Sequence, residues 1–161
     1  MAGEVYFEDN TLKVINTCEG AIEAALLECT AEVVSAAARN TRVATGKTKN
    51  SWRGETNKTS DGYEAVMGSP DENAIWEEFG TGEHALEGNG RKGAWYVPVE
   101  GYSGKKKPSY NGEVIVVYGK GGKAFYKTNG KEPTRALHNA IESQKPKIEK
   151  HFQNKFGIAF K

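Results

Sequence analysis

The first third of the chain repeats apolar residues every three or four positions, which is the spacing of one face of an α-helix. The repeat runs from Thr11 to Arg39. Its apolar positions are Ile15, Cys18, Ile22, Ala25, Leu26, Cys29, Val33 and Ala36. The pattern predicts one long amphipathic helix that buries this face.

Two pairs of glutamates flank the apolar face, Glu19 with Glu23 on one side and Glu28 with Glu32 on the other. Each pair is four residues apart, a spacing at which like charges on a helix repel weakly. The pairs are consistent with a solvated helix edge, or with an edge that faces basic groups of a neighbouring subunit.

The middle of the chain consists of short segments with strand character, separated by glycine-rich turns. We expect strands over residues 50–56, 63–67, 94–99, 113–118 and 124–127. Asp61-Gly62 is a hairpin signal between the first two. In the return strand the odd positions should face the core and Glu64 the solvent. Two short strands need cover from a helix, and the N-terminal helix is the expected cover.

A second apolar repeat lies near the C-terminus, at Leu137, Ile141, Ile148, Phe152 and Phe156. It predicts a helix entered through Pro133, since proline is well tolerated in the first turn. Pro146 should kink or divide this helix near Lys145. Taken together, the patterns predict an α+β fold, a short antiparallel sheet packed against a long N-terminal helix and a C-terminal helix.

The stretch Glu77-Glu78-Phe79-Gly80-Thr81-Gly82 predicts a sharp chain reversal, because glycine reaches left-handed backbone angles without strain. Trp76 and Phe79 are three residues apart and share one side of a helical turn. We expect this aromatic pair to be buried and to anchor the reversal on the N-terminal helix.

The length of 161 residues predicts a single domain over 1–161. Within it we expect a flexible arm at 1–10 and an enlarged loop and strand insertion at 83–127, with mobile stretches at 83–93 and 101–112. No apolar run approaches the roughly 20 residues of a membrane span. The acidic N-terminus also lacks the features of a signal peptide. These patterns predict a soluble intracellular product.

The chain has 22 Lys and Arg against 21 Asp and Glu. The resulting net charge of +1 predicts no strong bulk attraction to nucleic acid or membranes. Cys18 and Cys29 would lie about 16 Å apart on a helix, too far for a disulfide, and are expected to be buried free thiols.

Catalytic and cofactor motifs are weak. Gly46-Lys47-Thr48 resembles part of a phosphate-binding loop, but the glycine that this motif needs five places earlier is Thr41. The histidines His84, His138 and His151 lack metal-ligand spacing. We therefore expect no catalytic residue, no metal and no cofactor.

Four short elements follow the N-terminal helix in a fixed order, and together they resemble one family. They are Thr45-Gly46, Ser51-Trp52, Glu78-Phe79-Gly80-Thr81, and the pattern of Pro133, Arg135 and Leu137. In this order they are similar to the head–tail joining, neck or tail-completion proteins of tailed bacteriophages. The chain departs from the pattern at Thr48, where leucine is commoner, and in the size of the 83–127 insertion.

The resemblance implies a structural virion protein that is assembled in the host cytoplasm and joins the DNA-filled head to the tail. Such a protein forms a ring between the portal-side connector and the tail-tube or tail-terminator proteins, with DNA passing through the lumen without sequence specificity. It implies no catalysis and no membrane. Arg135 is then expected in the first turn of the C-terminal helix, paired with Glu77 or Glu78 within the subunit or across to the next.

The alternative is a small nucleic-acid-binding module based on the lysine- and tyrosine-rich region 102–127. Its candidate DNA-facing residues are Lys105, Lys106, Lys107, Lys120 and Lys123, with Tyr102 and Tyr110 nearby. Phosphate contacts would make its DNA affinity fall steeply with salt.

Overall fold

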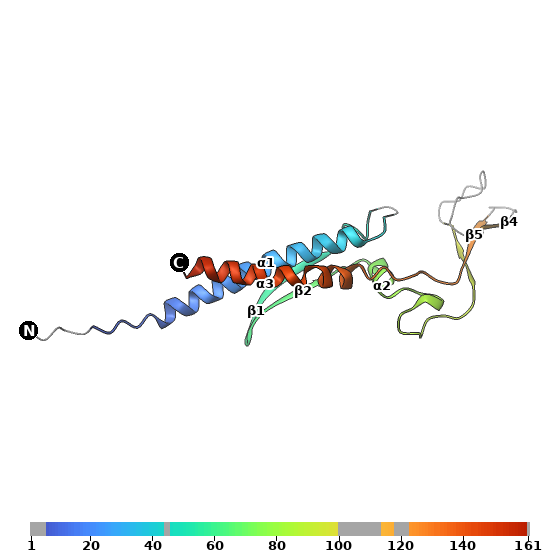
Figure 1. The fold of residues 1–161 in the computed structure, drawn as a ribbon. Coiled ribbons are helices and arrows are strands. Elements are labelled where there is room, and N and C mark those ends of the chain that lie inside the picture. The colour runs from blue at the N-terminus through green and yellow to red at the C-terminus, as the bar shows by residue number, and fades with distance from the viewer. Residues whose placement is uncertain (1–5, 44–45, 100–113, 118–122, 161) are drawn as a thin grey trace, which may run out of the picture. The chain divides into compact units, whose positions relative to one another are not determined.

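The computed structural model describes residues 6–43, 46–99, 114–117 and 123–160 (Figure 1). Its elements are, in order, α1 (Thr11–Asn40), β1 (Arg53–Thr59), β2 (Gly62–Gly68), α2 (Glu72–Phe79), the 3₁₀ helix η1 (Gly82–His84), β3 (Trp95–Pro98), β4 (Val114–Val117), β5 (Lys123–Thr128) and α3 (Ala136–Ala159). They divide into two compact units. The first unit contains residues 1–70 and 136–161, and the second contains residues 71–135.

The first unit is built on α1 and α3, which pack side by side in opposite directions (Figure 1). The Asn40 side chain, at the end of α1, donates to the carbonyl of Ala136 at the start of α3, at 3.2 Å. Their buried residues are mostly small: Ala21, Ala25, Cys29, Thr30, Val33, Ala36 and Ala37 on α1, and Ala136, Ala140 and Gln144 on α3. Small side chains at these positions let the two helices approach closely.

The β1–β2 hairpin completes the first unit and contacts α1, as predicted. Its register runs from Arg53 opposite Gly68 to Thr59 opposite Gly62. Along β2 the side chains of Tyr63 and Ala65 are half-buried, whereas the residue between them is exposed, which confirms the predicted alternation. A Cβ atom on Gly54 would lie 2.2 Å from Cγ2 of Thr30, so the hairpin backbone lies directly on the helix.

The second unit contains α2, η1 and a three-stranded antiparallel sheet in the order β3-β5-β4. Trp95 lies opposite Thr128, and Val114 opposite Tyr126. The predicted α+β class is confirmed, with its strands divided between two small sheets.

The C-terminal helix differs from the prediction at two places. It begins at Ala136, so Pro133 and Arg135 precede it instead of forming its first turn. Pro146 was predicted to kink or divide the helix near Lys145; α3 continues through Pro146, so the helix is not divided there. A proline removes one N–H donor from the helix, but α3 stays packed against α1, with Gln144 buried before the proline and His151 paired with Glu28 of α1 after it.

The predicted burial of Trp76 and Phe79 is wrong, because their side chains are 47% and 48% exposed. The helix α2 buries Ala74 and Glu77 instead. The reason is that Glu77 finds polar partners inside the second unit, as described below.

None of the described helices has the length and apolarity that crossing a bilayer requires.

Both cysteines are free, as predicted, with Cys29 buried and Cys18 half-buried. Burial raises the pKa of the Cys29 thiol, and the charges of Glu32 and Glu28 raise it further.

Candidate assembly site

The two motif elements of the second unit lie against each other, although about fifty residues separate them in the sequence. We call residues 77–82 and 129–135 the motif cluster. The backbone N–H of Thr81 donates to the carbonyl of Lys131, and the N–H of Lys131 donates to Oγ1 of Thr81, both at 2.9 Å. Two residues further on, the N–H of Glu83 donates to the carbonyl of Asn129 at 2.9 Å. The chain reversal predicted at 77–82 is therefore bonded to the segment that leads into α3.

Glu77 is the buried ionisable residue of the motif cluster, with 4% of its surface exposed. Its Oε1 forms an ion pair with Lys131 Nζ, and its Oε2 lies 2.7 Å from Oγ1 of Thr134. Its backbone carbonyl accepts from the N–H groups of Thr134 and Arg135 at 2.7 and 3.1 Å. A buried carboxylate is stable only when it is paired and hydrogen-bonded, and the 131–135 segment supplies these partners.

Two glycines make the close backbone approach possible. Gly82 has a φ of +61°, and a Cβ there would lie 2.2 Å from the carbonyl oxygen of Asn129. Gly130 has a φ of +128°, and a Cβ there would lie 2.0 Å from the carbonyl oxygen of Thr81. Side chains at either position would collide with backbone atoms that the cluster holds in place.

Glu83 extends the motif cluster into the 83–93 segment, which was predicted to be a flexible loop. Its Oε1 accepts from the N–H of Gly93 and its Oε2 from the side chain of Asn129, each at 3.0 Å. These two hydrogen bonds lower the pKa of the Glu83 carboxyl, the one from Asn129 more strongly. The first residue of this segment is thus bonded to the motif cluster, and its last residue, Gly93, is bonded back to the first.

Arg135 is the last residue of the motif cluster and has a left-handed backbone conformation with a φ of +51°. This conformation costs a non-glycine residue on the order of 1 kcal/mol. Its N–H is held by Glu77, while its side chain is exposed. The predicted pair with Glu77 or Glu78 does not form within the chain, and among the described residues none binds the guanidinium. The carboxylate of Glu77 is already occupied by Lys131 and Thr134.

The exposed side of α2 carries large apolar residues next to this cluster. Ile75 is 60% exposed, and Trp76 and Phe79 are about half exposed on the same helix. Leu86, also half exposed, donates its N–H to the carbonyl of Phe79 at 3.0 Å. Clusters of exposed apolar groups are a feature of protein-binding surfaces. The backbone hydrogen bonds of the motif cluster and of Leu86 to Phe79 fix the position of this end of α2.

The motif residues of the first unit serve packing. Trp52 is 5% exposed, and its Nε1 donates to Oγ1 of Thr41 at 2.7 Å, which ties the hairpin to the end of α1. Ser51 Oγ lies 2.5 Å from Ser69 Oγ. Gly46, with a φ of +83°, opens the turn before them. Leu137 is half-buried on α3, and Thr45 lies outside the described residues.

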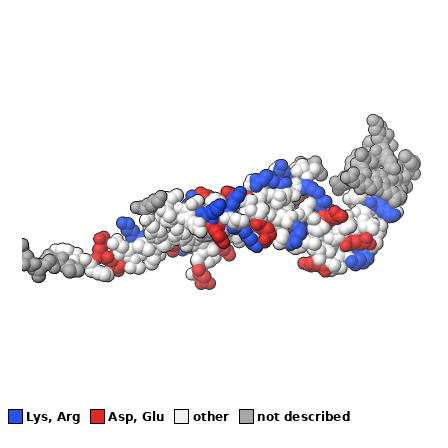
Figure 2. All heavy atoms as spheres, viewed as in Figure 1, with Lys and Arg blue, Asp and Glu red and all other residues white. Residues whose placement is uncertain are grey.

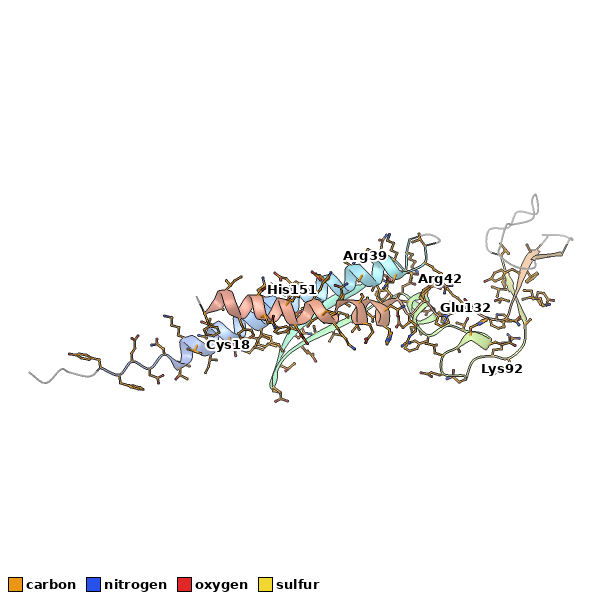
Figure 3. The ribbon with its side chains drawn as sticks, viewed as in Figure 1. Cys18, Arg39, Arg42, Lys92, Glu132 and His151 are labelled. Carbon is orange, nitrogen blue, oxygen red and sulfur yellow. The ribbon has the colours of Figure 1, made fainter. Side chains whose placement is uncertain are left out.

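The glutamates Glu28 and Glu32 face basic residues of their own chain, among them His151, which Figure 3 labels on α3. Nδ1 of His151 lies 3.0 Å from Glu28, and its Nε2 lies 3.2 Å from Glu32. Lys155 pairs with Glu28, and Lys147 Nζ lies 3.7 Å from Glu32. We call these pairs the charge ladder. The prediction placed these glutamates against solvent or a neighbouring subunit, whereas their partners lie on α3 of the same chain. The signal in the sequence was the four-residue spacing of Lys147, His151 and Lys155, which places all three on one face of α3.

The candidate DNA-facing lysines Lys105, Lys106, Lys107 and Lys120 lie outside the described residues, and Lys123 starts β5 with a side chain that is not described. Within the described part of the chain, no group of three or more His, Cys, Asp or Glu residues could hold a metal ion. Basic and acidic side chains are interspersed on the face shown in Figure 2.

No curated protein and no solved structure matches the chain significantly. One family model matches residues 16–80, which include most of α1, the β1–β2 hairpin and α2 up to Gly80. The family is described as "Bacteriophage HK97-gp10, putative tail-component". This match confirms the predicted resemblance to a phage head–tail or tail-completion family and supports a structural, tail-related role for the chain.

Proposed function

We propose that this chain is a structural component of the phage neck, a tail-completion or head–tail connector protein that joins the DNA-filled head to the tail. The observation that carries the proposal is the motif cluster. In this cluster a buried ion pair and several backbone hydrogen bonds hold the turn in place. The side chains of Phe79 and Arg135 on its outside remain exposed. A fixed, exposed turn of this kind suits recognition between protein subunits.

In this role the protein assembles into a ring and contacts the portal-side connector and the tail-tube or tail-terminator protein, without catalysis. DNA passes through the lumen of the ring without sequence-specific contacts. Arginine is well suited to such an interface, because its planar group binds a carboxylate with two parallel hydrogen bonds.

The proposal is tested by removing the Arg135 side chain in two ways. Arg135→Gly relieves the left-handed backbone, whereas Arg135→Ala keeps the strain. We expect Arg135→Gly to match or exceed the wild-type melting temperature. We expect both variants to reduce the yield of infectious particles at least about tenfold in an in vitro head–tail joining assay, since interface arginines are frequent binding hot spots.

Lys127→Ala, which removes an exposed positive charge elsewhere in the same unit, is the control and should leave the yield unchanged. Normal joining by both Arg135 variants would contradict the assembly role of this side chain. Normal joining by particles that lack the protein altogether would contradict the proposed function itself.

A further inference from the structure

His151 of α3 lies between two glutamates of α1. Its Nδ1 is 3.0 Å from Oε2 of Glu28, and its Nε2 is 3.2 Å from Oε1 of Glu32. The two glutamates are four residues apart, so they share one side of α1 and present both carboxylates to the same ring. The side chain of His151 is 21% exposed, so most of the ring is shielded from water.

These two contacts require more protons than a neutral imidazole carries. A neutral ring has one N–H group, which donates, and one nitrogen with a lone pair, which accepts. An ionised carboxylate only accepts. The lone pair of an unprotonated nitrogen would therefore face a carboxylate oxygen at 3.0 or 3.2 Å and repel it. Only an imidazolium, in which both nitrogens carry a proton, gives each carboxylate a donor.

The lysines next to His151 on α3 face different oxygen atoms. Lys155 pairs with Oε1 of Glu28, and Nζ of Lys147 lies 3.7 Å from Oε2 of Glu32. The ring faces the other oxygen of each carboxylate. Both lysines are four residues from His151, a spacing at which like charges repel only weakly. The hydrogen bond from Lys155 also lowers the pKa of the Glu28 carboxyl, which keeps this group ionised at neutral pH.

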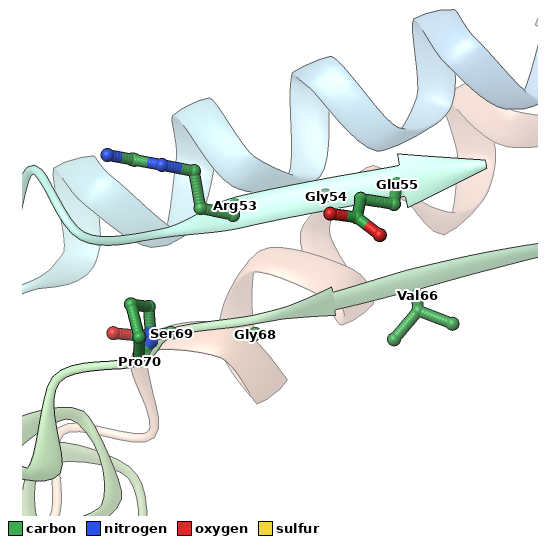
Figure 4. A pocket seen from close by; sticks show the side chains of 7 residues that line it. All are labelled: Arg53, Gly54, Glu55, Val66, Gly68, Ser69 and Pro70. Atoms are coloured by element: carbon green, nitrogen blue, oxygen red, sulfur yellow. The ribbon is translucent and has the colours of Figure 1, made fainter.

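The β1–β2 hairpin, which also packs on α1, directs its charges elsewhere. Gly54 faces α1, since a Cβ there would lie 2.2 Å from a side chain of the helix. Its neighbours Arg53 and Glu55 therefore lie on the opposite face of the strand (Figure 4). Lys58 is paired with Glu19 at 2.7 Å, about 13 Å further along α1 than the first glutamate of the ring contact. The ring is thus governed by the charges of α1 and α3.

We propose that folding of the first unit takes up a proton at His151, and that this proton strengthens the contact between α1 and α3. The unfolded chain holds an ordinary histidine, which is mostly neutral above about pH 6.5. The folded protein then binds one proton more than the unfolded chain, so its stability falls as the pH rises. The helix pair is a pH-sensitive device, more stable in mild acid than in alkaline solution. This inference does not depend on the proposed function.

Two variants of the full chain test the proton. Glu32→Gln replaces one carboxylate by an amide of the same shape, which can donate to an unprotonated ring nitrogen, so the second proton is no longer required. His151→Gln removes the titrating ring. Chemical denaturation is followed from about pH 6.5 to about pH 8.5. Over this range we expect the unfolding equilibrium constant of the wild type to rise at least about threefold more than that of either variant.

His84→Gln, at an exposed position of the second unit, is the matched control and should keep the wild-type pH dependence. Nitrogen NMR of the imidazole rings gives a readout that a merely structural role would not move. At about pH 7.5, where an ordinary histidine is about nine-tenths neutral, we expect two protonated ring nitrogens for His151 in the wild type. In Glu32→Gln at the same pH, one of them should be unprotonated.

An unprotonated ring nitrogen of His151 in the wild type at this pH would overturn the inference. Equal pH dependence of the wild type and Glu32→Gln would overturn it too. If His151→Gln does not fold, the Glu32→Gln comparison and the NMR signals decide the question without it. If head–tail joining does not need the protein, the proposed function fails while the protonated contact stands.

Discussion

Glu77 forms polar contacts in the second unit through both its side chain and its backbone. It holds Lys131 and Thr134 through its carboxylate and Thr134 and Arg135 through its carbonyl. Lys131 keeps 38% of its side chain exposed, so part of the ion pair is open to solvent screening. Most of the stabilisation should therefore come from the hydrogen bonds and from the absence of an unpaired buried charge.

We predict that Glu77→Ala lowers the free energy of unfolding by about 2 kcal/mol, since hydrogen bonds to charged groups contribute about 1.5–3 kcal/mol. Chemical denaturation followed by hydrogen exchange of residues 71–135 would measure the loss. Glu87→Ala, at an exposed loop position, is the control and should change stability by less than about 0.5 kcal/mol. A Glu77 variant as stable as this control would contradict the importance of the buried pair.

The sequence predicted the chain reversal after Phe79 from its glycines, and Gly80 does have a φ of +71°. It did not predict that Glu77 would be buried in place of Phe79. Burial there depends on Lys131, which lies 54 positions away along the chain. Local patterns show that an aromatic residue favours burial, but they do not contain the partner that makes burial of a carboxylate possible.

At the scale of elements, the α1–α3 pair is held by its small buried residues and by the charge ladder. The pKa of the Glu28 carboxyl is lowered, mainly by the hydrogen bond from Lys155 and further by His151. Partial desolvation of the carboxyl acts in the opposite direction. A carboxyl group whose pKa is lower in the folded state stabilises that state above its unfolded pKa. This stabilisation disappears as the pH falls through the lower, folded value.

We predict that the wild-type melting temperature falls between about pH 5 and about pH 2 more steeply than that of Glu28→Gln. The unfolded value for this carboxyl is near 4.5, so the loss should begin around that pH. Circular dichroism of the α1–α3 helices across this range would show it. Glu23→Gln, on an exposed position of α1, should retain the wild-type slope, and equal slopes for all three proteins would exclude a contribution from the ladder.

The apolar repeat placed both long helices well, with α1 starting at the predicted Thr11. It placed the start of α3 too early, because Pro133 suits a first turn but here belongs to the motif cluster. Repeats along one helix also do not show which helix lies opposite. The acidic pair on α1 and the basic face of α3 could be matched only once the antiparallel pairing was known.

For the whole molecule, the net charge of +1 and the mixed charges of Figure 2 bear on the nucleic-acid alternative. We predict weak DNA binding with a shallow dependence on salt, measured by fluorescence anisotropy of labelled duplexes between about 50 and about 200 mM salt. A steep slope that becomes shallower when Lys105, Lys106 and Lys107 are changed to alanine would instead favour the DNA-binding module. The matched control is alanine at Lys145, Lys147 and Lys150 of α3.

The strands of the molecule were predicted nearly in place, but their arrangement was not. The hairpin β1–β2 follows from Asp61-Gly62, a local signal. The order β3-β5-β4 depends on pairing across the long 99–123 interval, and no local pattern specifies it. The same limit applies to the separation of residues 71–135 into a unit of their own.

The close backbone contacts at Gly82 and Gly130 restrict how this gene can evolve. Every single-nucleotide missense change of a glycine codon introduces a residue with a Cβ atom. At these two positions that atom would meet a carbonyl oxygen at 2.2 and 2.0 Å, whichever residue is introduced. Missense changes at both codons are therefore not neutral. The codons of Glu87 and Asn89, whose side chains are exposed, remain free to vary. Purifying selection should act on the two glycines together, because each faces the backbone of the other's segment.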